Sequence, residues 1–176
     1  MITIIRNADV YKPEHIGVKD VLLLGNKIAA VDDNISIETK GCVEVKEIDG
    51  KGKSLVPGFI DCHVHILGGG GEGGFASRTP EVTLTGLTSA GVTTVVGCLG
   101  TDGMARDTIS LLAKARGLEE EGITTYIYTG SYRLPLKTIT GEIMKDIMVV
   151  DKIIGIGEVA LSIILSTTII SFIISP

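Results

Sequence analysis

The stretch Pro57-Gly58-Phe59-Ile60-Asp61-Cys62-His63-Val64-His65 is the most informative part of this chain. Its apolar pattern predicts a strand over residues 59–65. Because alternate residues of a strand point to the same face, His63 and His65 present two imidazoles side by side. Two neutral imidazoles so placed are suited to a catalytic divalent metal. The alternative is a half-buried strand that happens to carry two histidines. The chain has only 3 histidines, and we favour the metal site.

A glycine-rich run, residues 68–74 with the sequence GGGGEGG, follows this strand almost at once. Glycine has no Cβ, so backbone at such a run can approach a ligand closely. The run therefore predicts a loop that lies against whatever the metal acts on.

Composition limits the classes of function. The chain has 176 residues, of which 44% are hydrophobic, enough for the core of one ordinary domain. A formal net charge of -5 offers no basic surface, so we expect no nucleic acid and no membrane as partner. The 3 cysteines lack a CxxC spacing, and Cys62 is expected to be a small buried filler facing away from the histidines. The strand-like start without a signal peptide predicts a reducing cytoplasm.

The first 57 residues read as short strands and turns. Strands are expected at residues 2–5, 18–24, 27–31 and 42–48, with a tight turn at Gly25-Asn26. We interpret residues 1–57 as a small N-terminal β-sandwich segment.

After Pro57 strands alternate with helices. Strands are expected at 59–65, 92–96, 123–128 and from 153, and helices from 79 to Gly91, from 104 to 121 and from 140 to 152. Thr79 is expected to cap the first helix, with Pro80 in its first turn. Ile109, Leu112 and Ala113 are expected on one face of the second helix, which Gly122 ends. This alternation predicts an α/β fold with parallel strands, either a barrel or a doubly wound sheet.

Several spaced motifs carry a family resemblance. They are Pro-Gly-Phe-Ile-Asp-x-His-x-His at 57–65, the glycine run, Arg-Thr-Pro-Glu-Val at 78–82, Gly-Val-Thr-Thr-Val-Val-Gly at 91–97, Leu-Gly-Thr-Asp at 99–102 and Thr-Gly-Ser-Tyr at 129–132. In this order they resemble the isoaspartyl dipeptidase (β-aspartyl peptidase) family of the amidohydrolase superfamily, over residues 1–162. The resemblance implies a (β/α)8 barrel, of which residues 58–162 form about the first four βα units.

The same resemblance implies a binuclear divalent metal centre, with Zn2+ as the expected metal, and hydrolysis of β-aspartyl dipeptides by a hydroxide between the two metals. His63 and His65 hold one metal. Glu158 takes the place of a bridging carboxylated lysine if one glycine is inserted before it; alternatively it is an ordinary charge at a strand end. Lys152, the nearest lysine, is expected on the surface. The implied partners are a small dipeptide and, in full-length relatives, further copies of the same chain.

Four further residues receive roles from the resemblance. Glu72 accepts the α-amino group of the substrate, Gly70 offers backbone to it and Thr101 contacts it. Tyr132 is catalytic, donating a hydrogen bond to the scissile carbonyl oxygen. The alternatives are a solvated loop carboxylate, a turn or cap residue, and an aromatic at the rim. Arg78 and Arg133 remain unassigned, and His15 is expected in a surface loop.

The end of the chain departs from the family pattern. No charged residue occurs between Val159 and Pro176, and we interpret residues 163–176 as an aberrant apolar tail, the product of a frameshift after Ser162. The alternative is a genuine tail, either a buried strand pair or a membrane anchor. On the frameshift reading the chain is a truncated, inactive N-terminal part. Two other functions stay open: a cyclic-amide hydrolase of the dihydropyrimidinase or hydantoinase type, and a non-catalytic metal-binding fragment.

Overall fold

The structure is a computed structural model that describes residues 1–159, and the chain forms two compact units that divide between Pro57 and Gly58. The apolar tail predicted at residues 163–176, and the proposed frame change after Ser162, lie outside the described residues. Among the residues that are described, no helix is long and apolar enough to cross a membrane.

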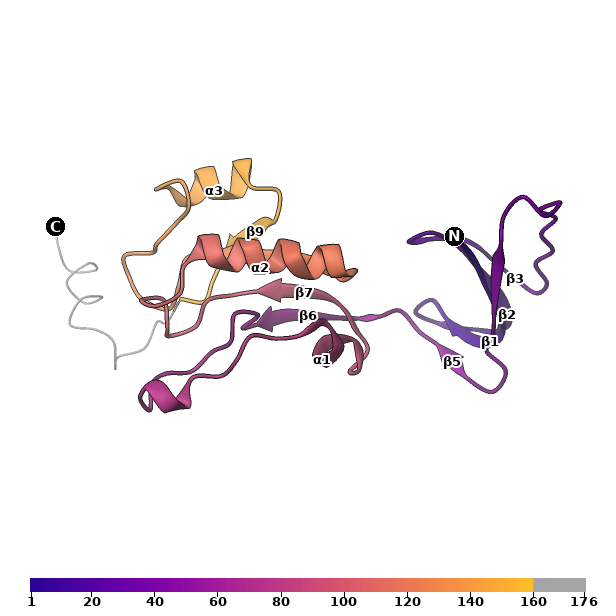
Figure 1. Ribbon diagram of the computed structural model, residues 1–176, viewed down its shortest axis with the longest axis horizontal. Coiled ribbons are helices and arrows are strands. Elements are labelled where there is room, and N and C mark those ends of the chain that lie inside the picture. The colour runs from indigo at the N-terminus through magenta and orange to yellow at the C-terminus, as the bar shows by residue number, and fades with distance from the viewer. Residues whose placement is uncertain (160–176) are drawn as a thin grey trace. The chain divides into compact units, whose positions relative to one another are not determined.

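The first unit is a single mixed sheet of five strands (Figure 1). Its strands are β1 (Ile2–Tyr11), β2 (His15–Leu24), β3 (Lys27–Asp32), β4 (Val45–Asp49) and β5 (Ser54–Leu55). The order is β3-β2-β1-β4, and β5 also pairs with β1. Strands β1, β2 and β3 are antiparallel neighbours, whereas β4 and β5 run parallel to β1.

The turn at Gly25-Asn26 is confirmed, because Leu24 pairs with Lys27 across the β2–β3 hairpin. The expectation of a β-sandwich is not confirmed, since all five strands join one hydrogen-bonded sheet rather than two facing sheets. A small core of Ala8, Val10 and Val21 lies on one face of this sheet. His15 is exposed as expected but begins β2 instead of lying in a loop.

The second unit is built on a parallel sheet whose strands alternate with helices, which confirms the predicted α/β class. Its elements are β6 (Phe59–Val64), a 3-10 turn (Phe75–Ser77), α1 (Leu84–Thr88), β7 (Val92–Gly97), α2 (Thr108–Glu121), β8 (Thr124–Thr129), α3 (Ile143–Val149) and β9 (Ile153–Ile156). The strand order is β6-β7-β8-β9, with every neighbouring pair parallel. The carboxyl ends of all four strands therefore meet along one edge of the sheet.

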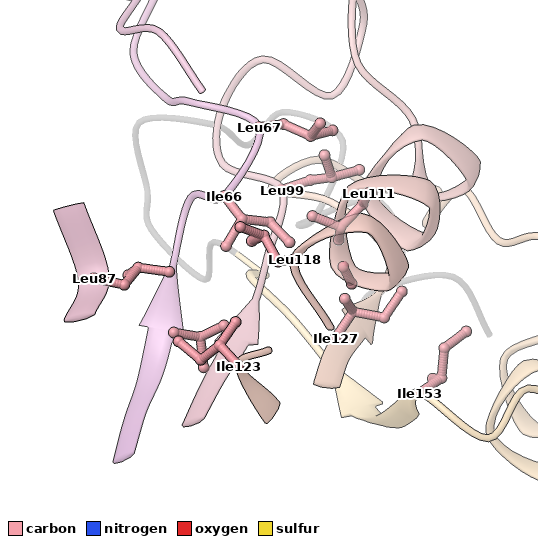
Figure 2. Packing of buried hydrophobic residues seen from close by; sticks show 11 residues of the cluster. Ile66, Leu67, Leu87, Leu99, Leu111, Leu118, Ile123, Ile127 and Ile153 are labelled. Carbon is pink, nitrogen blue, oxygen red and sulfur yellow. The ribbon is translucent and has the colours of Figure 1, made fainter. Parts of the chain in front are cut away.

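Helix α2 packs through a face shifted from the one predicted, and of the three residues predicted for it only Leu112 packs against the core. Leu111, Ala115 and Leu118 are buried, whereas Ile109 is 63% exposed. The spacing of the buried residues follows one stripe of a 3.6-residue helix, and the stripe begins at Thr108 rather than Ile109. Figure 2 shows the resulting core. It comprises Ile66, Leu67, Leu87, Val95, Leu99, Leu111, Ala115, Leu118, Ile123, Ile127 and Ile153.

The predicted helix start at Thr79 is wrong. Helix α1 begins five residues later, where the Thr83 hydroxyl accepts a hydrogen bond from the Gly86 amide. The Thr79 hydroxyl instead contacts the backbone of Gly69, at 2.7 Å from its amide nitrogen. Thr79 thus fixes the glycine-rich loop, and the chain after it does not become helical until Leu84.

Two further expectations about single side chains are wrong. Lys152 is buried rather than on the surface, because its ammonium donates to the Glu119 carboxylate and to the Thr125 carbonyl. Cys62 is exposed rather than a buried filler. The predicted stop at Gly122 is confirmed by its left-handed backbone, with φ of 117°.

Candidate metal centre

Four potential metal ligands converge at the carboxyl edge of the parallel sheet. Donor atoms of His63, His65, Cys98 and Glu158 all lie within 4.8 Å of one another. His63 and His65 come from the end of β6, Cys98 follows β7, and Glu158 follows β9. Residues nearly a hundred positions apart in the sequence therefore share one site because parallel strands end at the same edge.

The geometry of these donors suits a small divalent cation. Nε2 of His63 lies 3.0 Å from Oε2 of Glu158, and Nε2 of His65 lies 3.5 Å from the same oxygen. Ligands about 2.0 to 2.3 Å from a tetrahedral Zn2+ are separated by roughly 3.3 to 3.8 Å, as follows from those bond lengths. Two imidazole nitrogens and one carboxylate oxygen are also the donor chemistry that Zn2+ accepts.

Two glycines confine the ring of His65. A Cβ atom at Gly100 would lie 2.7 Å from Cε1 of His65, and one at Gly69 would lie 3.2 Å from its Cγ. Any side chain at Gly100 would therefore collide with the imidazole. The absence of side chains at these two positions lets backbone close in on the ring and hold it in one orientation.

Cys98 is a member of the group that sequence reasoning missed. Its side chain is buried, and Sγ lies 3.8 Å from Nδ1 of His65. Burial, followed by the nearby carboxylates of Glu158 and Asp61, raises the pKa of the Cys98 thiol to about 12. A usable sign was present in the sequence, because Cys98 follows a predicted parallel strand just as His65 does.

The glycine-rich loop brings a second pair of predicted residues together. The Thr101 hydroxyl donates a hydrogen bond of 2.5 Å to the Glu72 carboxylate. This bond, and more weakly the nearby His65, hold the pKa of Glu72 below its ordinary value. Gly70, Glu72, Thr101 and Arg133 line one open pocket of about 160 Å3. The pair therefore presents an ionised carboxylate near the histidines.

The remaining candidates are placed differently. Tyr132 is half-buried in the loop after β8, and among the described residues no hydrogen bond joins it to the metal ligands or to Glu72. Arg78 pairs with Asp102 at 2.8 Å, while Arg133 lies at the pocket. His15 is far from this chemistry in sequence and pairs with Asp9 at 2.5 Å.

A parallel sheet with paired histidines at the end of its first strand and a carboxylate after its fourth has the ligand arrangement expected of the amidohydrolase superfamily. No family model matches the chain. Curated relatives are dihydroorotases: that of Ligilactobacillus salivarius is 32% identical over 142 residues, covering 78% of this chain and 31% of the relative. That of Elusimicrobium minutum is 38% identical over 97 residues, covering 52% and 20%.

Among solved structures, the β-aspartyl dipeptidase of Fervidobacterium islandicum AW-1 in complex with a β-Asp-Leu dipeptide is 52% identical. It matches with a TM-score of 0.86 over 96% of this chain and 43% of its own length. The chain is thus a relative of the β-aspartyl dipeptidases within the amidohydrolase superfamily. It spans less than half the length of each of these relatives.

Proposed function

We propose that this chain takes part in the hydrolysis of β-aspartyl dipeptides, with His63, His65 and Glu158 as ligands of a divalent metal, for which Zn2+ is the expected ion. The observation that supports this most strongly is an ionised Glu72, held by Thr101, in a pocket formed in part by the glycine-rich loop that follows His65. A divalent metal in such a centre supplies an activated water and polarises the scissile carbonyl.

Substrate recognition would rest on the glycine-rich loop. A β-aspartyl dipeptide carries a free α-ammonium group close to the bond that is cleaved. The Glu72 carboxylate offers this ammonium a charge-assisted hydrogen bond, and its hydrogen bond from Thr101 fixes its direction. Gly70 lines the same pocket and offers backbone to the substrate. A dipeptide anchored in this way would extend toward the metal ligands.

Tyr132 is proposed as a catalytic residue. It follows β8, the strand between those that end at Cys98 and near Glu158. A phenol hydroxyl at this edge can donate to the carbonyl oxygen as negative charge develops on it. This role needs the loop after β8 to bring the ring against the substrate.

A second candidate is the hydrolysis of a cyclic amide. It is favoured by the curated dihydroorotases, which are 32% to 40% identical over parts of this chain. The metal ligands would serve either reaction. The two candidates differ at Glu72, because a cyclic amide such as dihydroorotate has no free ammonium group for that carboxylate to bind.

The experiment supplies the chain with Zn2+ and offers β-Asp-Leu, α-Asp-Leu and dihydroorotate in parallel. We expect calorimetry to detect binding of β-Asp-Leu alone and, because the chain is predicted to be a truncated N-terminal part, chromatography to detect no leucine released from it. The variant Glu72→Gln should weaken binding of β-Asp-Leu about tenfold or more, whereas Glu120→Gln, an exposed control on α2, should not. Hydrolysis of dihydroorotate with no binding of the dipeptide would replace this proposal by the cyclic-amide function.

A further inference from the structure

Cys98 is fixed to the histidine strand by its backbone. Its amide donates a hydrogen bond of 3.0 Å to the carbonyl of Val64, the residue between the two histidines. Val64 itself pairs with Gly97, so this bond continues the β6–β7 pairing at the next residue. The side chain of Cys98 is buried. The sulfur is therefore held at the carboxyl edge of the sheet by strand register and not by a free loop.

The Cys98 sulfur lies among the other donor atoms of the metal group. It is within 4.8 Å of the donor atoms of His63, His65 and Glu158, and it lies 3.8 Å from Nδ1 of His65. In a tetrahedral zinc site, a sulfur about 2.3 Å and a nitrogen about 2.0 Å from the metal are roughly 3.6 Å apart, as follows from those bond lengths. A contraction of roughly 1 Å would bring even the widest pair to this spacing.

The thiol can change from a protonated group to a ligand when a cation arrives. Burial and the carboxylates of Glu158 and Asp61 raise the pKa of Cys98 to about 12, so the thiol keeps its proton without a metal. A coordinating thiol is deprotonated by the metal itself. On binding, the S–H bond breaks, the sulfur electron pair binds the metal, and the proton passes to the buffer. The thiolate then adds a negative charge to that of Glu158 beside the cation.

We propose that Cys98 is a fourth ligand that closes the metal centre of His63, His65 and Glu158 and makes it prefer thiophilic divalent ions. Three protein ligands leave one position of a tetrahedral metal open for water, whereas four fill it. Water or substrate then joins the metal only as a fifth ligand. Thiolate sulfur also favours Zn2+ and Cd2+ over Mn2+, which prefers oxygen donors. The inference rests on the metal centre of the proposed function, but not on which amide is hydrolysed.

Cobalt substitution tests ligation by sulfur directly. The Co2+-loaded wild-type chain should show a sulfur-to-cobalt charge-transfer band in the near ultraviolet, and Cys98→Ser should lose it. The matched control is Cys62→Ser, because Cys62 lies between the same histidines but is exposed, and this variant should keep the band. A wild type without the band, or a Cys98→Ser variant that keeps it, would overturn the inference.

A second measurement uses the wild type alone, so it does not depend on whether a variant folds. With Cd2+ bound, cadmium-113 NMR should show coupling of the metal to the Cβ protons of Cys98 as well as to histidine ring protons. Coupling to ring protons alone would leave the sulfur outside the coordination sphere and contradict the proposal.

Metal preference gives a third readout. Chelator competition measures the affinities for Cd2+ and Mn2+, and the ratio of the two should fall roughly 10- to 100-fold in Cys98→Ser, at least the loss that follows removal of a group that supports a metal ligand. Cys62→Ser should keep the ratio of the wild type. An unchanged ratio in Cys98→Ser would count against sulfur as a ligand.

The outcomes also separate this inference from the proposed function. A wild type that binds Zn2+ and β-Asp-Leu but shows no charge-transfer band with Co2+ removes the role of Cys98 and leaves the dipeptidase proposal intact. A band in a chain that does not bind β-Asp-Leu removes the dipeptidase proposal and leaves this one. A wild type that binds no divalent metal removes both.

Discussion

Each of the two units has a buried carboxylate that is surrounded by hydrogen-bond donors, whereas the carboxylate of the metal group, Glu158, has few. In the first unit Asp20 is buried and accepts hydrogen bonds from Nη1 of Arg6 at 2.6 Å and from the amides of Asn7 and Ile35. Arg6 also pairs with Glu47. Both carboxylate oxygens of Asp20 therefore accept from donors of the same unit, as a structural role requires.

In the second unit Asp146 is saturated in the same way. It is fully buried on α3, and its oxygens accept from the hydroxyls of Thr129 and Thr140 and from the amides of Ile139 and Thr140. These bonds join α3, the loop before it and the end of β8. A carboxylate with this many donors stabilises the fold and has little capacity left for a ligand.

Glu158 contrasts with both. Its side chain is 29% exposed, and the partners of its Oε2 in the described chain are the imidazoles of His63 and His65. Neutral imidazoles compensate a carboxylate poorly, whereas a cation shared with them compensates it well. The number of hydrogen bonds that a carboxylate accepts from the protein therefore distinguishes structural carboxylates from candidate metal ligands. Removing the first kind should cost stability, and removing the second should cost metal affinity.

The largest effect is expected at Asp146. The variant Asp146→Asn keeps the shape but turns an amide NH2 toward groups that are themselves donors. Since a buried unsatisfied donor costs about 1 to 3 kcal/mol and several are affected, we expect a loss of roughly 3 kcal/mol or more. Urea unfolding followed by amide exchange in β8 measures it. A loss below about 1 kcal/mol would contradict the structural role.

The second prediction concerns pH. Burial raises the pKa of Asp20 and of Asp146, but the hydrogen bonds that each accepts lower it more, so both lie below the ordinary value. A lowered folded pKa gives stability that is complete above the unfolded pKa of about 3.9 and is lost as pH falls through the folded value. Unfolding free energies at pH 7, 5, 4 and 3 should therefore fall only at the acid end.

The control for this profile is Asp20→Asn, which removes one of the two titrating groups. Its unfolding free energy should be lower than that of the wild type at pH 7 and should depend less on pH below 4. A profile as steep as that of the wild type would show that other carboxylates cause the acid loss.

The third prediction tests whether Glu158 contributes to metal binding rather than to stability. Glu158→Gln should weaken Zn2+ binding roughly 10- to 100-fold, because a neutral amide replaces an anionic ligand. In the metal-free chain it should change stability by no more than about 0.5 kcal/mol. Chelator competition and urea unfolding give the two numbers. If Glu158→Gln greatly lowered the unfolding free energy of the metal-free chain, Glu158 would be a structural carboxylate like Asp20 and Asp146.

Features that depend on one strand, or on the order of parallel strands, were predictable from the sequence. His63 and His65 lie together because alternate residues of a strand share a face. Glu158 follows the fourth parallel strand, and parallel strands end at the same edge of the sheet, so Glu158 was expected at the edge that carries the histidines. The tight turn at Gly25-Asn26 and the helix end at Gly122 were also readable, since each needs a backbone conformation that few residues tolerate.

Features that depend on packing between elements were not predictable. That Cys98 follows a parallel strand was readable from the sequence, but its contact with His65 depends on the register of β6 with β7, which no local pattern encodes. Lys152 was assigned to the surface because its neighbours in sequence do not reveal Glu119 and the Thr125 carbonyl. Thr79 has the features of a helix cap, but its hydroxyl contacts the glycine-rich loop instead. The sequence predicted that the buried face of α2 begins at Ile109, whereas packing against the sheet buries a face that begins one residue earlier, at Thr108.

The smallest effect is expected at Thr101. Thr101→Val keeps the volume and removes the hydroxyl that donates to Glu72, so the pKa of Glu72 should rise toward its ordinary value. Glu72 stays ionised at pH 7, and binding of β-Asp-Leu should weaken only about threefold, the effect of losing one hydrogen bond that orients an exposed group. Calorimetry at pH 7 measures this loss.

Thr101→Val also tests whether Glu72 is a ligand-binding carboxylate rather than a structural one. Since Glu72 and Thr101 meet on loops, Thr101→Val should leave the urea midpoint of the second unit unchanged, and Thr85→Val on α1 is the matched control for the change in side chain. The loss of binding should grow at lower pH, because a Glu72 with a less depressed pKa gains its proton earlier as the pH falls. A threefold loss that stays constant from pH 7 to pH 5 would mean that Thr101 contacts the dipeptide itself rather than acting through Glu72.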